Sequence, residues 1–289
     1  MPDSLAPKCG GDFNPGLAEH SEMSSQKMQK GFAFTKLADR LASVAELSDA
    51  DIELLSDMPF AIDHFASHDQ LLRRADRPAR CCLLLQGYLS WKDGNHGQIT
   101  SIYVPGDIPD LHTIVAPRID AQLTALGPAV VAWTPHAFLR EISSQSPSLD
   151  HALRLLGLAD AACMRNWIIN LGSRDSLSRV AHLICEITTR LRAVGLAKDD
   201  RFPSPFTQSD LGSACAISAV HVNRVIQELR RREVLTWQSR TITIIDWQAL
   251  CRIACFEPDY LGLRSSGSST HYRPQPSSAA GTSEFSNFR

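Results

Sequence analysis

The sequence lacks the features of a membrane or secreted protein. None of its apolar runs approaches the roughly 20 residues that a membrane-spanning helix needs. Its N-terminus also lacks a basic start followed by an apolar core, which is the pattern typical of a signal peptide. We therefore predict a cytoplasmic protein. The 289 residues carry a net charge of only −2, so any affinity for nucleic acid must come from local basic clusters.

The sequence also lacks clustered metal ligands and a catalytic motif. Its eight cysteines are scattered. Although Cys251 and Cys255 lie one helical turn apart, no second ligand pair stands near them. No glycine-framed nucleophile or phosphate-binding loop is present, so we expect no enzymatic activity, no metal, no cofactor and mostly reduced structural thiols. Alternation along residues 81–85 would place one of Cys81 and Cys82 in the core and one outside, which leaves a redox role open.

The most informative stretch, residues 206–235, predicts a helix, a tight turn and a second helix. Thr207 can cap the first helix, and Asp210 three residues later completes a capping box. Residues 216–217 form the corner, and Ser218 caps the second helix. That second helix has an apolar stripe for burial, which consists of Val222, Val225, Ile226 and Leu229.

The other face of the second helix carries small and hydrogen-bonding side chains, near the end that a helix-turn-helix inserts into the major groove. An Arg can place two donors on guanine O6 and N7, and an Asn or Gln amide can pair with adenine N6 and N7. The predicted base contacts are Ala219, His221, Asn223, Arg224 and Gln227. The predicted phosphate contacts are Thr207, Gln208, Ser218 and Arg240.

A basic run and a predicted hairpin follow. Residues 230–232 are three arginines at the helix C-terminus, where cations suit the helix dipole and can meet phosphate. Residues 218–240 contain five Arg against two Glu, a net charge of +3. Residues 235–245 indicate two short strands about a turn at 238–240, because β-branched residues flank a polar tip. A hairpin directly after the second helix makes a winged helix. Asp246 caps a last helix at residues 247–255, which we expect Pro258 to end.

Together these residues resemble the C-terminal winged-helix domain of the Crp/Fnr family of bacterial transcription regulators. The resemblance rests on residues 207–211, 217–218, 222, 224–225, 229 and 241–246, and it extends upstream to about residue 34. It implies a sequence-specific DNA-binding regulator that binds a palindromic operator as a homodimer, with RNA polymerase as a further partner. One residue departs from the pattern: many members place a Glu that reads cytosine two residues after the corner Ser, where this chain has Val220.

The N-terminal half predicts one or two short helices and then a β-rich domain. In residues 34–55, Ser48 and Asp51 form a second capping box. Residues 60–133 consist of short β-rich runs separated by turn residues, which include Gly87 and the segment 105–107. Strands at such regular spacing suggest a sandwich or barrel. Their order resembles the β-roll sensor of the same family.

The resemblance weakens at the sensor's ligand. Members that bind cyclic nucleotides follow their Gly-Asp with a Gly-Glu for the ribose hydroxyl and later an Arg-Ser or Arg-Thr for the phosphate. Here Leu111 cannot replace that Glu, and Asp120 would repel a phosphate. The lone Cys9 likewise argues against the N-terminal cysteine cluster of iron–sulfur sensors. We expect a degenerate or non-cyclic-nucleotide sensor with an unknown small effector, and a candidate effector pocket at Asp110, His112 and Arg118.

The predicted fold is therefore α+β, with a β-roll (jelly-roll-like) sensor, a long central helix and a winged helix-turn-helix. The expected boundaries are a disordered tail at 1–31, the sensor at 32–145, a dimerisation helix at 146–172, the DNA-binding domain at 173–262 and a disordered tail at 263–289. Pro147 suits the entry of the central helix, with Ser148 or Asp150 as its cap.

Two alternatives remain open at this point. The central helix has two apolar faces, one for its own sensor and one for a partner chain, but it could instead be buried within a single chain. The β-roll could also bind a small molecule or metal while the winged helix docks on a protein rather than on DNA. Steep weakening by salt would favour DNA, because counterion release drives that binding.

Overall fold

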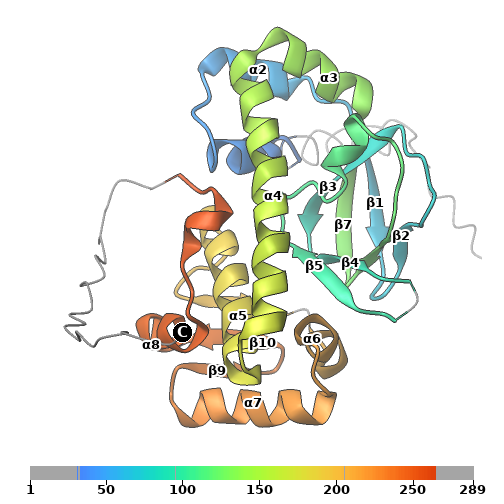
Figure 1. Ribbon diagram of the computed structural model, residues 1–289. Helices are drawn as coiled ribbons and strands as arrows, with labels where there is room; N and C mark the ends of the chain where they lie inside the picture. Colours follow the sequence, from blue (N-terminus) through green and yellow to red (C-terminus); the bar gives the residue numbers. More distant parts are fainter. Residues whose placement is uncertain (1–30, 32, 95, 205, 265–289) are drawn as a thin grey trace, which may run out of the picture.

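The computed structural model describes residues 31, 33–94, 96–204 and 206–264. The expected tails, 1–31 and 263–289, lie outside this described part except for residues 31, 263 and 264. Figure 1 shows a β-rich domain and a helical domain, both packed against one long upright helix, α4 (Pro147–Ser173). Within the described part of the chain, no helix is both long and apolar enough to cross a membrane.

Two helical segments precede the first strand, and the second is tied to α4. Residues 33–42 are helical, and α2 (Asp49–Ser56) follows. The predicted capping box is confirmed: Ser48 N donates to the Asp51 carboxylate at 2.8 Å, and Asp51 N donates to Ser48 Oγ. The same carboxylate accepts from Ser146 Oγ, and from Ser148 Oγ at 2.8 Å. Burial opposes ionisation of Asp51, but these serine hydrogen bonds outweigh it and lower the pKa to about 2.

The β-rich domain consists of two antiparallel sheets. One has the order β1 (Ala61–Phe65), β7 (Ala129–Pro135), β3 (Arg80–Gln86). The other has the order β2 (Gln70–Leu72), β6 (Gln122–Ala125), β4 (Leu89–Lys92), β5 (Ile99–Tyr103). The turn after β3 requires glycine, because Gly87 has φ +82° and a Cβ there would lie 2.3 Å from the Pro128 carbonyl oxygen.

Strand β3 corrects the expectation for its two thiols. Cys81 and Cys82 are both buried, at 1% and 0% exposure. Cys81 packs in the apolar cluster under the N-terminal helices and α4, whereas Cys82 packs in the cluster between the sheets. Alternation along the strand is intact, but packing covers both faces of this sheet. Burial raises the pKa of both thiols, so neither is a reactive surface thiolate. The seven described cysteines are all free.

The start of α4 also differs from expectation. A short turn η1 (Leu111–Ile114) and helix α3 (His136–Gln145) precede it. Ser146, rather than Ser148 or Asp150, is the N-cap, since its Oγ accepts from Leu149 N at 3.1 Å. Pro147 takes the first helical position, which makes the residue before it the cap. Ser148 instead bonds Asp51.

The C-terminal domain is a winged helix with one strand that the sequence did not indicate. Its elements are α5 (Ser176–Ala193), β8 (Arg201–Pro203), α6 (Gln208–Cys215), α7 (Ala219–Arg231), β9 (Leu235–Gln238), β10 (Thr241–Ile244), α8 (Trp247–Ala254) and η2 (Pro258–Leu261). Strand β8 pairs with β10 as an edge strand, where Pro203 is tolerated. Asp246 caps α8 as predicted, but the helix ends at Ala254 and Pro258 opens η2 instead.

The two domains share one core. Tyr88, Ile102 and Leu126 of the β-roll belong to the same buried cluster as the core of the winged helix. Tyr88 Oη also donates to the Pro203 carbonyl at 2.8 Å. The DNA-binding domain candidate is therefore held against the sensor of its own chain.

Candidate nucleic-acid interface

The helix-turn-helix begins at the predicted capping box. Thr207 N and Oγ1 both donate to the Asp210 carboxylate, and Asp210 N donates back to Thr207 Oγ1 at 3.1 Å. The corner residue Ala216 is left-handed, with φ 51° and ψ 47°. Gly212 allows the corner to close, because a Cβ there would lie 2.6 Å from the Ile217 carbonyl oxygen. That requirement was visible in the sequence only as a glycine inside a helix.

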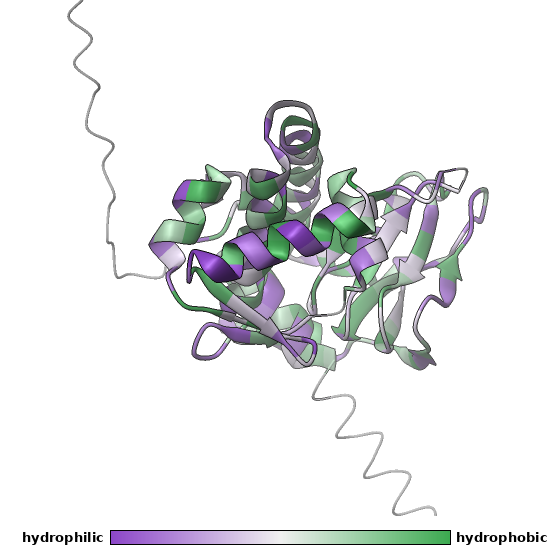
Figure 2. Cartoon of the chain, turned by 90° about the horizontal axis from the view of Figure 1, so that it is seen from below, coloured by the Kyte–Doolittle hydropathy of each residue, from purple (hydrophilic) through white to green (hydrophobic). Residues whose placement is uncertain are grey.

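Helix α7 presents one face to the core and the other outwards. Ser218 Oγ accepts from His221 N at 3.2 Å and caps the helix. Val222, Val225 and Leu229 are buried as predicted, and Ile226 is half-buried. In Figure 2, which views the molecule from below, α7 lies across the front with alternating polar and apolar residues. Its outer face is therefore open to a large partner.

The five predicted base contacts all lie on α7 and are exposed, but they do not share one orientation. His221 Nε2 lies 2.7 Å from Ser176 Oγ at the start of α5. Asn223 Oδ1 accepts from Gln208 Nε2 at 2.9 Å, so one predicted base contact is bonded to one predicted phosphate contact. These two side chains lie toward the flanks of α7, whereas Arg224 and Gln227 are on its outer face.

The predicted phosphate contacts separate into two places. Thr207, Gln208 and Ser218 lie at the starts of α6 and α7. Arg240 lies elsewhere: it lines a cavity of about 460 Å³ between the wing and the β-roll. Its guanidinium would be 4.0 Å from a Cβ at Gly127, on the β6–β7 turn.

The basic run at the end of α7 is partly neutralised within the helix. Arg231 and Arg232 each bond the Glu228 carboxylate at 2.7 Å. Hydrogen bonds from these two arginines lower the pKa of Glu228 to about 2. The local net charge stays positive, because the five arginines of residues 218–240 still outnumber the two glutamates.

The candidate effector residues are not brought together. His112 lines a cavity of about 1060 Å³ between the β-roll and α4, and neither Asp110 nor Arg118 is among the lining residues. Asp110 is fully buried and accepts from Cys82 N at 2.8 Å, and burial raises its pKa to about 7. Arg118 is exposed on a loop. Among the described residues, no group of three or more His, Cys, Asp or Glu could hold a metal ion.

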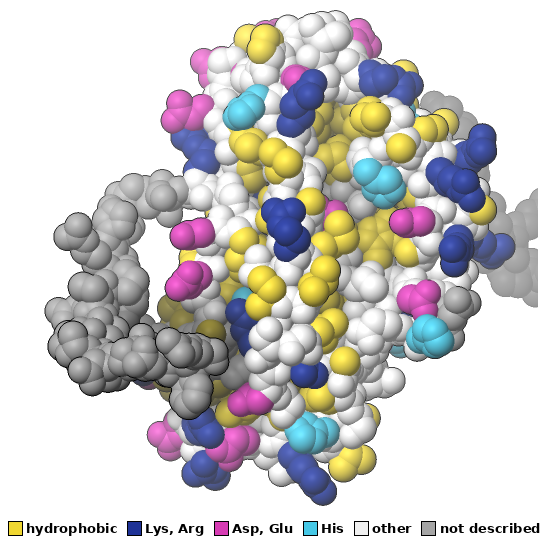
Figure 3. Space-filling model, viewed as in Figure 1, with side chains coloured by type: hydrophobic (Ala, Val, Ile, Leu, Met, Phe, Trp, Pro, Cys, Tyr) yellow, Lys and Arg dark blue, Asp and Glu magenta, His cyan; other side chains and the backbone are white. Residues whose placement is uncertain are grey.

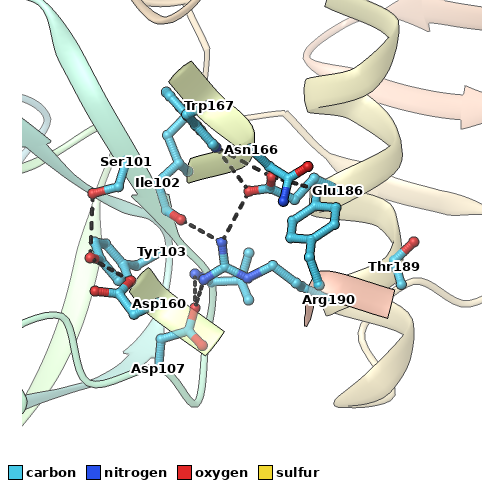
Figure 4. A network of polar contacts seen from close by, with 12 residues as sticks. Ser101, Ile102, Tyr103, Asp107, Asp160, Asn166, Trp167, Glu186, Thr189 and Arg190 are labelled. Carbon is cyan, nitrogen blue, oxygen red and sulfur yellow. Dashed lines mark hydrogen bonds and ion pairs between the residues drawn. The ribbon is translucent and has the colours of Figure 1, made fainter. Parts of the chain in front are cut away.

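A buried polar network joins this cavity to the winged helix, and no local pattern of residues predicts it. Arg190 of α5 donates to Asp107 at 2.5 Å and to the Ile102 carbonyl at 2.7 Å (Figure 4). Asp107 also binds Arg40, at 2.9 Å. On the other side Glu186 lies 3.5 Å from Arg190 and accepts from Trp167 Nε1. Arg190 and Asp107 are 83 residues apart, so only the fold brings them together.

A second set of contacts fixes α6 to the tip of the β4–β5 hairpin. Ser213 Oγ donates to the Gly97 carbonyl at 2.6 Å and accepts from Ile99 N at 3.0 Å. Lys92 lies 3.7 Å from the Asp210 carboxylate of the capping box. The helix that precedes α7 is thus held directly by the sensor domain.

Comparisons with known proteins agree with this architecture. A family model of a Crp-like helix-turn-helix domain matches residues 178–253. The anaerobic regulatory protein of Pasteurella multocida is 25% identical over 157 residues, which are 54% of this chain and 57% of that protein. The fumarate and nitrate reduction regulatory protein of Vibrio cholerae is 21% identical over 170 residues, 59% of this chain and 67% of that protein. The chain thus spans between about half and two thirds of the lengths of these two relatives.

Solved structures with low sequence identity share the fold. FixK2 from Bradyrhizobium japonicum has a TM-score of 0.60 at 18% identity and covers 68% of this chain and 98% of its own. A putative cAMP-binding regulatory protein from Silicibacter pomeroyi has a TM-score of 0.52 at 14% identity and covers 79% of this chain and 99% of its own. At these identities the likeness establishes the arrangement of β-roll, long helix and winged helix.

Proposed function

We propose that this chain, which belongs to the Crp/Fnr family of transcription regulators, binds a palindromic DNA operator as a homodimer through helix α7. The observation that supports this most directly is the outer face of α7. It carries exposed Arg224 and Gln227 on a helix that is capped at its N-terminus and buried on its other side. Such a helix fits the major groove, and these side chains can reach base edges.

Homodimer formation is supported by the outer face of α4. Leu158, Ile168 and Ile169 are 65%, 72% and 50% exposed on this helix. Leu158, Ala161, Arg165 and Ile168 are spaced by three and four, which is the spacing of a helix–helix seam, and Arg165 is the one charged residue among them. Figure 3 shows hydrophobic side chains along this face. A second copy of the chain is the proposed occupant, since two-fold symmetry places two α7 helices on two half-sites.

The proposed effector is not a cyclic nucleotide. Four arginines line the larger cavity. Arg40 and Arg190 are bound to Asp107, Arg154 is bound to Asp150, and Arg140 donates to the Ile114 carbonyl at 3.2 Å. The lining also includes Asp93, Asp120 and Asp160. These carboxylates oppose a phosphate group. A cytoplasmic location and RNA polymerase as a partner belong to the same proposal.

The test is selection of bound duplexes from a random DNA pool by the purified full chain, followed by affinity measurements over a salt series. We expect a palindromic site whose affinity falls steeply with salt, because phosphate contacts release counterions. An affinity that salt does not change, or no enriched sequence, would contradict DNA reading by α7.

A further inference from the structure

The first turn of α7 presents an apolar side chain where a DNA reader would meet the bases. Val220 is 66% exposed and is not part of the buried clusters of the described residues. Residues 220, 224, 227 and 231 follow one another at spacings of four, three and four, so they form a single row on the helix. Val222, Val225 and Leu229 are buried on the opposite side. Val220 therefore lies in the same outward row as Arg224 and Gln227.

Local structure gives no reason for valine at this position. A β-branched residue has lower helix propensity than alanine, and the buried stripe of α7 is complete without it. A single exposed apolar residue is common on protein surfaces, so exposure alone carries no weight. The location is what matters: the first turn of a capped helix, one turn before Arg224. The flanking residues His221 and Asn223 are already bonded to Ser176 and Gln208.

The chemistry of an isopropyl group selects one base. In the major groove guanine, adenine and cytosine present hydrogen-bond donors and acceptors, whereas thymine also presents the C5-methyl group. Packing valine against a donor or acceptor would leave that group without a partner, which is unfavourable. Packing it against the methyl group buries apolar surface. Valine is also stiff at χ1 in a helix, so its two methyl groups are held in place before DNA arrives.

Resting on the proposed DNA-binding function, we propose that Val220 reads a thymine through its C5-methyl group. Residues four apart on a helix are about 6 Å apart along its axis, which is roughly two base-pair steps. The thymine read by Val220 therefore lies within about two base pairs of the base pair read by Arg224, once in each half-site.

The test uses the duplex that the wild-type chain selects from a random pool. Each thymine is replaced in turn by deoxyuridine, which keeps every hydrogen-bonding group and removes only the methyl. We expect about fourfold weaker binding at one position per half-site, as for one buried methyl group. Val220→Ala should lose most of this sensitivity at that position and keep its response at the others. Because Val220 is exposed and alanine favours helix, the variant is expected to fold, which its thermal unfolding curve checks.

The outcomes separate this assignment from the proposed function. The first outcome is a wild-type chain that enriches a site and yet loses no more binding than Val220→Ala at any deoxyuridine position. In that case Val220 does not read a thymine methyl. The assignment would also be overturned if the base pair at which Val220→Ala loses its sequence preference is a G·C pair. If the wild-type chain enriches no sequence, DNA reading itself fails, and the role of Val220 fails with it.

Discussion

Replacing Arg190 with methionine should strongly destabilise the fold, because it leaves the buried Glu186 without its paired arginine and leaves Asp107 with Arg40 alone. Arg190 is 7% exposed and contacts Asp107 at 2.5 Å and Glu186 at 3.5 Å. Arg190→Met keeps an unbranched stem in the core but removes the charge. Breaking a buried ion pair by deleting one partner typically costs about 3–5 kcal/mol. We expect a loss in the free energy of unfolding in that range.

The loss should also depend on pH in a stated direction. Burial raises the pKa of Glu186, and Arg190 is the first of the groups that oppose this rise. Without Arg190 the pKa of Glu186 rises further. A carboxyl whose pKa is higher in the folded state than in the unfolded state contributes stability at low pH and loses it as the pH rises. Arg190→Met should therefore be less impaired at pH 5 than at pH 8.

Urea unfolding at one fixed protein concentration measures both effects, since the stability of a dimer depends on concentration. Arg154→Met is the matched control, because the Arg154 side chain is 73% exposed and bonds only the nearby Asp150 at 2.7 Å. An exposed pair contributes at most about 1 kcal/mol. Equal losses for the two variants, or a loss at Arg190 that does not change with pH, would refute the role assigned to the buried network.

Three further changes test helix α7, the proposed dimer seam on α4 and the hydrogen bonds of Asp51 with its serine partners. Arg224→Ala should weaken operator binding by about 1–3 kcal/mol and relax the sequence preference at one base pair per half-site. The control Arg74→Ala, at an exposed arginine of the β-roll, should do neither. Equal weakening on all DNA sequences would contradict base reading by Arg224. Ile168→Asp should give monomers in analytical ultracentrifugation, because it places a charge in the proposed dimer seam. The control Ile245→Asp, also at an exposed aliphatic residue, should leave the mass unchanged. A monomeric wild-type chain would contradict the proposed seam. Asp51→Asn should lower the free energy of unfolding by about 1–3 kcal/mol at pH 7, because the neutral amide makes weaker hydrogen bonds. The difference between variant and wild type should disappear as the pH falls toward the lowered Asp51 pKa of about 2. A difference that persists at that pH would show that the charge of Asp51 is not the cause.

Much of the C-terminal domain could be predicted because its signals are local. The capping box at Thr207, the caps at Ser218 and Asp246 and the stripe of α7 all depend on residues within one or two helical turns. Such patterns act through backbone amides and faces of the same segment, so the sequence contains them completely. The resemblance to a known family joined these local elements into one architecture.

Other features were decided only by tertiary packing. Whether both Cys81 and Cys82 are buried depends on what covers the second face of β3, and strand alternation does not carry that information. Arg240 has the positive charge expected of a phosphate contact, yet the fold places it at a cavity beside the β-roll. The sequence thus determined the helix-turn-helix and its outer face. The fold decided how the helix-turn-helix is fixed to the sensor, because ion pairs such as Arg190–Asp107 join residues that only long-range packing brings within bonding distance.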